Sequence, residues 1–109
     1  MVRRFCEGIA MHYLLFYDAV DNYEERRKPH REAHIAYARA AIARDELVLA
    51  GALSGPADGA VLLFRADSPA AAENFAKSDP YVLNGLIKQW RVREWRTVVG
   101  AAAEVKIHW

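Results

Sequence analysis

The chain has 109 residues, of which 53% are hydrophobic, and its 15 basic and 14 acidic side chains leave a net charge of +1. This length predicts one domain with a single core. The near-neutral charge excludes the strongly basic surface typical of proteins that bind nucleic acid or anionic lipid, so we expect neither as a partner. The only cysteine, Cys6, cannot form an internal disulfide, which favours a cytoplasmic location.

The N-terminal part of the chain divides into an extension, residues 1–10, and an apolar strand, residues 11–17. Glu7 and Gly8 interrupt the apolar run that a secretory signal would need. The apolar stretch is also shorter than the roughly 20 residues that span a bilayer, so we expect a soluble protein. Aromatic and aliphatic residues follow one another in the strand, with His12 as the exception, which indicates that both of its faces are shielded.

The main helix and a hairpin come next. A polar turn over residues 18–22 follows the strand, and Asp21 or Asn22 is expected to cap a short turn over residues 24–27. Pro29 suits the first turn of the main helix, which runs through an alanine-rich stretch to Arg44. Two apolar strands, 47–53 and 60–64, are joined by a turn rich in Gly, Pro and Asp, which predicts an antiparallel hairpin.

The second helix is predicted over residues 67–77, with Asp67 or Ser68 as its cap and Pro69 in its first turn. It should end before Pro80, because a residue that precedes proline is disfavoured in helical geometry. We expect one helical turn near residues 81–85 and a long alternating last strand over 87–99. The tail, residues 100–109, either frays or adds a short strand.

This order of elements predicts an α+β protein with the ferredoxin-like βαββαβ arrangement, in which both helices cover one face of a sheet. The other face would then be open, although the strands at 11–17 and 60–64 are apolar at consecutive positions. We therefore expect a homodimer in which this face packs against the same face of a second copy, as a dimeric α+β barrel.

The start of the main helix carries the strongest functional signal. At 3.6 residues per turn, Arg31 and His34 fall on the arc that also holds Ile35, Ala38, Ala41 and Ile42, whereas Glu32, Arg39 and Glu46 point elsewhere. A guanidinium and an imidazole thus share the face that should enter the core. Because polar groups at core positions need partners, this pattern indicates a pocket.

The segments Arg31-Glu-Ala-His34, Ala50-Gly51 and Ser78-Asp-Pro-Tyr81, in this order and spacing, resemble the YCII-related (YciI-like) family over residues 11–99. The resemblance implies a dimeric ferredoxin-like fold whose pocket holds a catalytic His and Asp, which fall on His34 and Asp79. It also implies that a few relatives are similar to lactone-processing enzymes that remove halide from chloromuconolactones.

Each candidate site residue has a functional and a structural interpretation. His34 is a general base oriented by Asp79, or a core histidine bonded to backbone. Asp79 orients His34, acts as acid and base itself, or only caps a turn. Arg31 binds a substrate carboxylate, or forms an ion pair with an acidic neighbour. Tyr81 offers its hydroxyl to substrate, or packs its ring. Ser78 is a candidate substrate contact, but no Gly-x-Ser-x-Gly elbow makes it a nucleophile.

His30 and His34 have a spacing that can bind a metal, but no third ligand is evident, so we predict no metal. No glycine-rich phosphate loop or dinucleotide motif occurs, so we predict no cofactor. The first functional hypothesis is a small enzyme that uses His/Asp acid–base chemistry on a small carboxylate or lactone, as a lyase, isomerase or hydrolase. The alternatives are a non-catalytic metabolite-binding or assembly module, and a monooxygenase-like barrel with a roomier, more apolar cavity.

Overall fold

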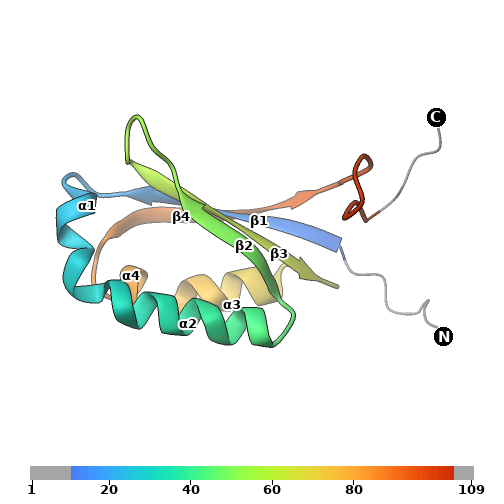
Figure 1. Ribbon diagram of the computed structural model, residues 1–109, viewed down its shortest axis with the longest axis horizontal. Coiled ribbons are helices and arrows are strands. Elements are labelled where there is room, and N and C mark those ends of the chain that lie inside the picture. Colours follow the sequence, from blue (N-terminus) through green and yellow to red (C-terminus); the bar gives the residue numbers. More distant parts are fainter. Residues whose placement is uncertain (1–10, 105–109) are drawn as a thin grey trace.

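The computed structural model describes residues 11–104, which form a four-stranded sheet with two longer helices against it (Figure 1). Cys6, the predicted extension and residues 105–109 lie outside the described residues. The elements in chain order are β1 (Met11–Ala19), α1 (Tyr23–Arg26), the 3₁₀ turn η1 (Lys28–His30), α2 (Arg31–Ala43), β2 (Leu47–Ala52), β3 (Gly59–Ala66), α3 (Ala70–Ser78), α4 (Pro80–Leu83) and β4 (Ile87–Trp95).

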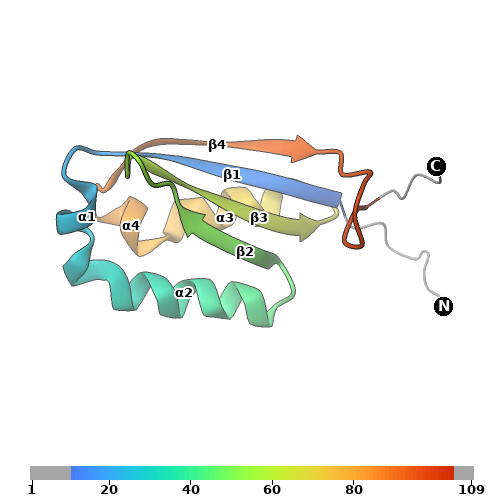
Figure 2. The ribbon, with the colours of Figure 1, turned by 45° about the horizontal axis from the view of Figure 1, so that its top comes forward.

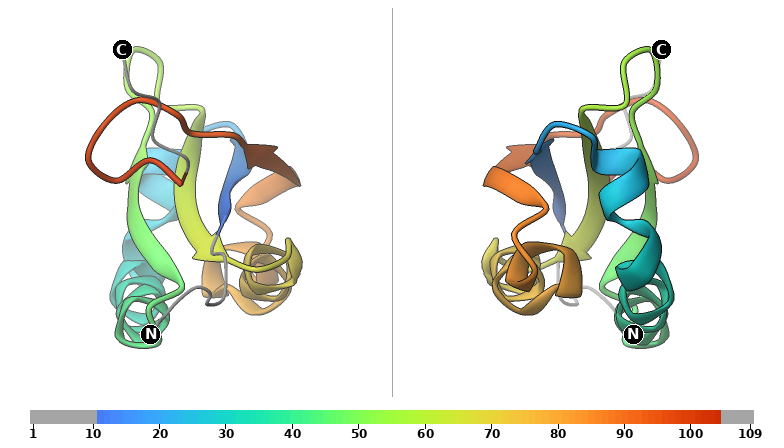
Figure 3. Two further views of the ribbon diagram at one scale, coloured as in Figure 1. Left: turned by 90° about the vertical axis from the view of Figure 1, so that its right-hand side faces the viewer. Right: turned by 90° about the vertical axis from the view of Figure 1, so that its left-hand side faces the viewer.

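The sheet has the strand order β2-β3-β1-β4, and every neighbouring pair is antiparallel. With α2 and α3 on the same face, this is the ferredoxin-like βαββαβ arrangement that the sequence predicts, which is the protomer fold of dimeric α+β barrels. Figure 2 shows α2 running beneath the edge strand β2, and Figure 3 shows both helices on one side of the twisted sheet.

Several boundaries differ from the predictions, and α3, predicted to begin at residue 67, begins at Ala70, with Pro69 at the N-cap position and no side-chain hydrogen bond from it. Pro29 lies in the 3₁₀ turn that precedes α2, because a backbone hydrogen bond from His30 to Arg27 closes this tighter turn first. The last strand ends at Trp95, which pairs with His12 near the start of β1, so residues 96–99 find no further strand partner among the described residues. None of the helices in residues 11–104 has the length and hydrophobicity needed to cross a membrane.

The core lies between the sheet and the helices. Along β1, alternate residues from Tyr13 to Ala19 point toward the helices and are buried, as the two-residue period of a strand requires. Leu15 of β1 and Phe64 of β3 are fully buried on neighbouring strands, and Phe75 of α3 packs edge-on against Phe64, with ring centroids 5.3 Å apart. Alanines at the helix contacts allow α2 and α3 to approach the sheet closely.

The opposite face of the sheet, which we call the outer sheet face, is apolar over its middle. Its apolar members are Leu14 and Phe16 of β1, Val61 and Leu63 of β3, and Leu49 of β2. Leu49 is 61% exposed, and the other four are partly buried. No helix of the described residues covers this face (Figure 3). The sequence predicts that both faces of β1 are shielded, and this single chain buries only one of them fully.

Candidate functional site

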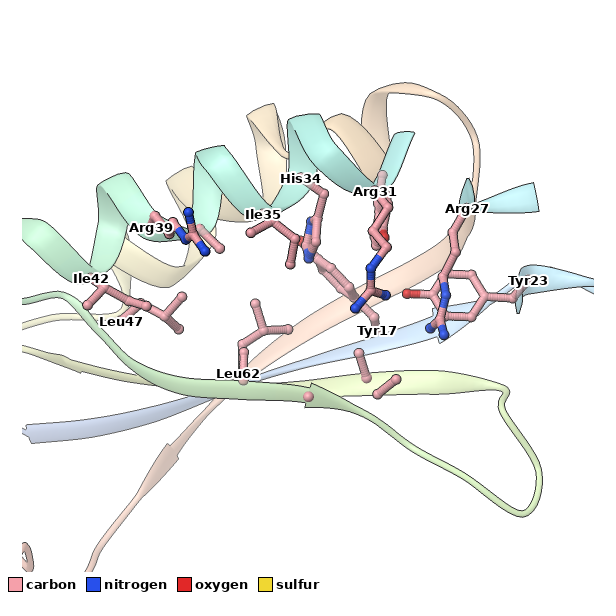
Figure 4. Close-up of a pocket in the computed structure, with 16 residues that line it drawn as sticks. Tyr17, Tyr23, Arg27, Arg31, His34, Ile35, Arg39, Ile42, Leu47 and Leu62 are labelled. Carbon is pink, nitrogen blue, oxygen red and sulfur yellow. The ribbon is translucent and has the colours of Figure 1, made fainter. Parts of the chain in front are cut away.

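A cavity of about 330 Å³ opens between α2 and the edge strand β2 (Figure 4). The cavity exists because the residues on its β2 side are small: Ala50 and Ala52 pair with the inward-facing Leu62 and Ala60 of β3, and Gly51 lies between them. On the other side, His34, Ile35 and Ala38 of α2 line it. A cavity of this size suits a small molecule.

Asp79 is the buried acid beside this cavity. It precedes Pro80 in extended geometry, with ψ of 128°, and its side chain is 0% exposed. Its Oδ1 accepts a hydrogen bond from the backbone N–H of Tyr81 at 3.0 Å, which caps α4. Its Oδ2 accepts a hydrogen bond from the hydroxyl of Tyr17 at 2.6 Å. Both carboxyl oxygens are therefore fixed by the fold.

His34 completes the arrangement from the first full turn of α2. Its Nδ1 lies 2.7 Å from Oδ1 of Asp79, and its side chain is 15% exposed. With Nδ1–H donated to the carboxylate, the lone pair of the imidazole is on Nε2. No described residue accepts from or donates to Nε2, and His34 lines the cavity. Nε2 is therefore the atom available to exchange a proton with a bound molecule.

Tyr81 packs its ring against His34. The ring stacks on the imidazole of His34, with centroids 3.8 Å apart and an angle of 5° between planes. Tyr23 meets the same ring edge-on at 5.9 Å. The ring of Tyr81 therefore holds one face of the His34 imidazole, whereas Asp79 holds its edge at Nδ1. Burial raises the pKa of Tyr81, so it remains a neutral phenol near pH 7.

Tyr17 belongs to the site although the sequence analysis did not single it out. Burial, and then the neighbouring carboxylate of Asp79, raise the pKa of its phenol. Tyr17 therefore stays protonated and serves as a hydrogen-bond donor to Asp79. Its inward position on β1 follows from strand alternation, but nothing local in the sequence places it beside a residue 62 positions further along the chain.

Three arginines line the cavity: Arg31, Arg27 and Arg39. Arg31 was predicted on the core-facing arc of the main helix; it lines the cavity but is exposed, because the buried arc of α2 runs through His34, Ala38 and Ala41. Arg39 was predicted to point elsewhere, and this prediction is wrong, since Arg39 is at the cavity rim. Arg27 was not singled out, because it precedes the main helix. None of the three forms an ion pair with a described acidic residue.

Ser78 does not reach the site. It is exposed at the end of α3 and does not line the cavity. The core-facing positions of α3 include Ala76, and two residues further on the helix has turned by about 200°, which directs Ser78 to the far side. His30 also lies off the cavity lining. Within residues 11–104, no three His, Cys, Asp or Glu side chains gather in a way that could hold a metal ion.

Sequence comparison identifies the family. The model of the YCII-related domain matches residues 11–96, most of the chain. The protein belongs to the YCII-related family. The matched segment contains every residue of the Tyr17–Asp79–His34 cluster and the three cavity arginines. No curated protein matches this YCII-related chain.

Solved structures similar to this YCII-related chain share its fold at low sequence identity. One is 5-chloro-2-hydroxyhydroquinone dehydrochlorinase (TftG) from Burkholderia phenoliruptrix AC1100, in complex with 2,5-dihydroxybenzoquinone: it is 21% identical with a TM-score of 0.68, over 80% of this chain and 95% of that one. Another is a NIPSNAP-like domain protein from Burkholderia xenovorans, 12% identical with a TM-score of 0.56, over 89% of this chain and 90% of that one.

Proposed function

We propose that the protein is a small enzyme in which His34, oriented by Asp79, moves a proton on a small carboxylate- or lactone-type substrate. The observation that carries this proposal is the 2.7 Å hydrogen bond between His34 Nδ1 and the fully buried Asp79, with the other imidazole nitrogen left for the cavity. A buried carboxylate that fixes the tautomer of a histidine is the recurring arrangement of general acid–base catalysis.

The proposed step is a proton abstraction followed by elimination. Nε2 of His34 takes a proton from a carbon of the substrate, the electron pair of that C–H bond forms a double bond, and a leaving group departs with its own bonding electrons. Asp79 stabilises the imidazolium that forms. Arg31, exposed at the cavity mouth, binds a carboxylate or stabilises the developing oxyanion. The step belongs to the lyase class and, without a leaving group, becomes an isomerisation.

The structural neighbour TftG supports a choice of test compounds. Its name describes a dehydrochlorinase, which removes the elements of hydrogen chloride, and its structure holds a dihydroxybenzoquinone. The same chemistry needs one base and an anion-stabilising group, which His34 and Arg31 can supply. We therefore propose halogenated hydroxyhydroquinones and halogenated lactones as substrate candidates for this chain.

A second candidate function is a metabolite-binding module that does not transform its ligand. The observation that favours it is the capping of α4 by Asp79, because this contact gives the buried acid a structural role that requires no catalysis. The two candidates differ in one observable. A binding module returns its ligand unchanged after prolonged incubation, whereas an enzyme converts it.

We also propose that the protein acts as a homodimer through the outer sheet face. Five apolar side chains form this face, and no helix of the described residues covers it. Arg91 crosses above the Phe16 ring, 4.5 Å from its centroid, and so places a positive charge at the border of the apolar area. A central apolar area with a charged border is the usual organisation of a protein–protein interface.

The test of the enzymatic proposal begins with a thermal-shift screen of halogenated hydroxyhydroquinones, small lactones and enol acids. Compounds that raise Tm are then incubated with the protein and followed by NMR for loss of a proton and release of halide. His34→Ala should lower turnover by about 10²-fold or more. His30→Ala is the matched control, because His30 precedes the same helix and lies off the cavity, and it should keep full turnover. Equal turnover in wild type and His34→Ala would refute the assignment.

A further inference from the structure

The cavity has two chemically different ends. Figure 4 shows Arg27, Arg31 and Tyr23 at one end, near the start of α2, and Ile42 and Leu47 at the other, with His34 between them. Arg39 lies beside Ile42 but is exposed at the rim, so a ligand that fills this length meets two guanidinium groups at one end and a mainly apolar wall at the other. This asymmetry defines a class of ligand, and the inference below rests on the proposed function of the same site.

The polar end holds two guanidinium groups, from Arg27 in the connection between α1 and η1 and from Arg31 at the start of α2. The guanidinium carbon of Arg27 lies 5.1 Å from the centroid of the Tyr23 ring, and the Tyr23 ring meets the Tyr81 ring edge-on. Burial raises the pKa of both phenols, and the positive charges of Arg27 and Arg31 oppose that rise at each of them. Both guanidinium groups lie at the end of the cavity that holds Tyr23 (Figure 4).

The acidic groups nearby do not neutralise these cations. Glu25, the acid two residues before Arg27, pairs instead with Lys28 at 2.9 Å. Asp79 is occupied by Tyr17, His34 and the backbone of Tyr81. Within residues 11–104, neither Arg27 nor Arg31 has a carboxylate at ion-pair distance. Two positive charges and two hydroxyl donors therefore converge at the polar end, a set that suits an oxyanion with two negative charges.

The apolar end is formed by Ile42 and Leu47, and the small residues of β2 continue the wall from there toward the middle of the cavity. Ala50 faces inward opposite Leu62, so its methyl group forms part of the wall beneath which a flat ring could lie. The stacked pair of His34 and Tyr81 lies between this end and the arginines. A ring placed under β2 would therefore put the atom next to its charged substituent beside Nε2 of His34.

We propose that the cavity selects ring-bearing molecules that carry a doubly charged oxyanion group, with Arg27 and Arg31 holding the charges and the Ala50 wall holding the ring. Arg27 is the residue that sets the preference for two charges over one. Two neighbouring carboxylates and one phosphate present the same double negative charge to Arg27 and Arg31. Phthalate and phenyl phosphate are therefore both used as probes, to distinguish a dicarboxylate ligand from a phosphate ligand.

The experiment measures binding of phthalate, phenyl phosphate, benzoate and malonate by calorimetry to the full chain, with folding of each variant checked by circular dichroism. Wild type should bind phthalate or phenyl phosphate about tenfold more tightly than benzoate. Arg27→Gln should reduce this preference to about twofold, because one cation is lost. Arg26→Gln is the matched control, because Arg26 is an exposed neighbour that does not line the cavity, and it should leave the preference intact.

Ala50→Leu tests the apolar end independently of the charges. The larger side chain should weaken phthalate binding about tenfold and leave malonate, which has two carboxylates and no ring, unchanged. Equal binding of benzoate and of both doubly charged probes by wild type, equal effects of Arg27→Gln and Arg26→Gln, or unchanged phthalate binding in Ala50→Leu would each overturn the proposal. Calorimetry measures binding without turnover, so the ligand class is tested separately from the catalytic role that the turnover of His34→Ala tests.

Discussion

His34 and Asp79 are 45 positions apart in the chain, and Nδ1 of the histidine lies 2.7 Å from Oδ1 of the aspartate. The fold creates this contact by placing the start of α2 beside the loop between α3 and α4, against the same face of the sheet. The aspartate is fully buried and the histidine borders a cavity. The two ionisable side chains thus connect the interior of the protein with an open cavity, and the predictions below depend on this contact.

Asp79→Asn should lower both turnover and stability. An amide can accept with only one atom, so it cannot serve Tyr17, His34 and the Tyr81 backbone together, and it no longer fixes the tautomer of His34. We expect a loss of about 10²-fold or more in kcat and a drop of about 1–3 kcal/mol in the free energy of unfolding. Urea denaturation and the NMR assay measure the two effects. Asp45→Asn, at an exposed turn, is the control, and wild-type kcat in Asp79→Asn would contradict the proposed role.

Tyr81 separates the role of a ring from that of a hydroxyl. Tyr81→Phe keeps the ring that stacks on His34, so kcat should stay within about threefold of wild type while affinity for an anionic ligand falls. Tyr81→Ala removes the stack and opens a cavity in a buried position, which should cost about 3–5 kcal/mol of stability. Loss of turnover in Tyr81→Phe would contradict this prediction, because it would show that the Tyr81 hydroxyl takes part in the chemistry.

Tyr17 predicts how stability depends on alkaline pH. The pKa of its phenol is raised above its ordinary value of 10.0, first by burial and then by Asp79. Below pH 10 both folded and unfolded chains keep this proton. Above pH 10 the unfolded chain loses it while the folded chain keeps it, so the free energy of unfolding falls as pH rises, by at most about 1.4 kcal/mol per pH unit for this group.

Tyr17→Phe should reduce that dependence. Urea unfolding of wild type and variant at pH 9, 10 and 11 measures it, and the titration of lysines and of the other tyrosines is common to both proteins. The difference between the two curves therefore isolates the Tyr17 phenol. The variant should be less stable than wild type at pH 9, and the gap should narrow by pH 11. A gap that stays constant over this range would show that Tyr17 titrates normally in the folded chain.

The homodimer is tested at the centre of the outer sheet face. Leu63→Asp places a charge among Leu14 and Leu49, and buried unpaired charges are strongly unfavourable at an interface. Wild type should sediment as a dimer, and the variant as a folded monomer. Leu83→Asp is the matched control, because Leu83 of α4 is 67% exposed and lies off the sheet, so it should leave the dimer intact. A monomeric wild type at micromolar concentration would contradict the prediction.

Local patterns in the sequence were sufficient for the fold and for the position of His34 on the apolar arc of the main helix. Proline and glycine positions delimited the elements, and the helical spacing of Arg31 and His34 identified a polar group on an otherwise apolar arc. The partner Asp79 came from the family motif rather than from spacing, because contact between residues so far apart depends on how α2 and α4 pack. The same reason explains why Tyr17 was missed: its neighbours in the strand are equally apolar, and only the assembled core distinguishes it.

The exposed ends of side chains were harder to predict than the backbone. Arg39 reaches the cavity rim from a position assigned to the far side of the helix, because a long flexible side chain covers more of the helix circumference than its Cα suggests. Ser78 was included because it adjoins Asp79, and a helical position two residues from a core contact points outward instead. Arg27 lies in a short connecting segment, where no periodicity applies.

The strand that bounds the cavity lies at the margin of the sheet, and two of its inward side chains, Ala50 and Ala52, end at Cβ. Such a wall can be remodelled by exchanging one alanine at a time, without disturbing the buried acid or the stacked rings on the opposite side. Single replacements in β2 should therefore change which ligands fit the cavity while His34 and Asp79 stay in place.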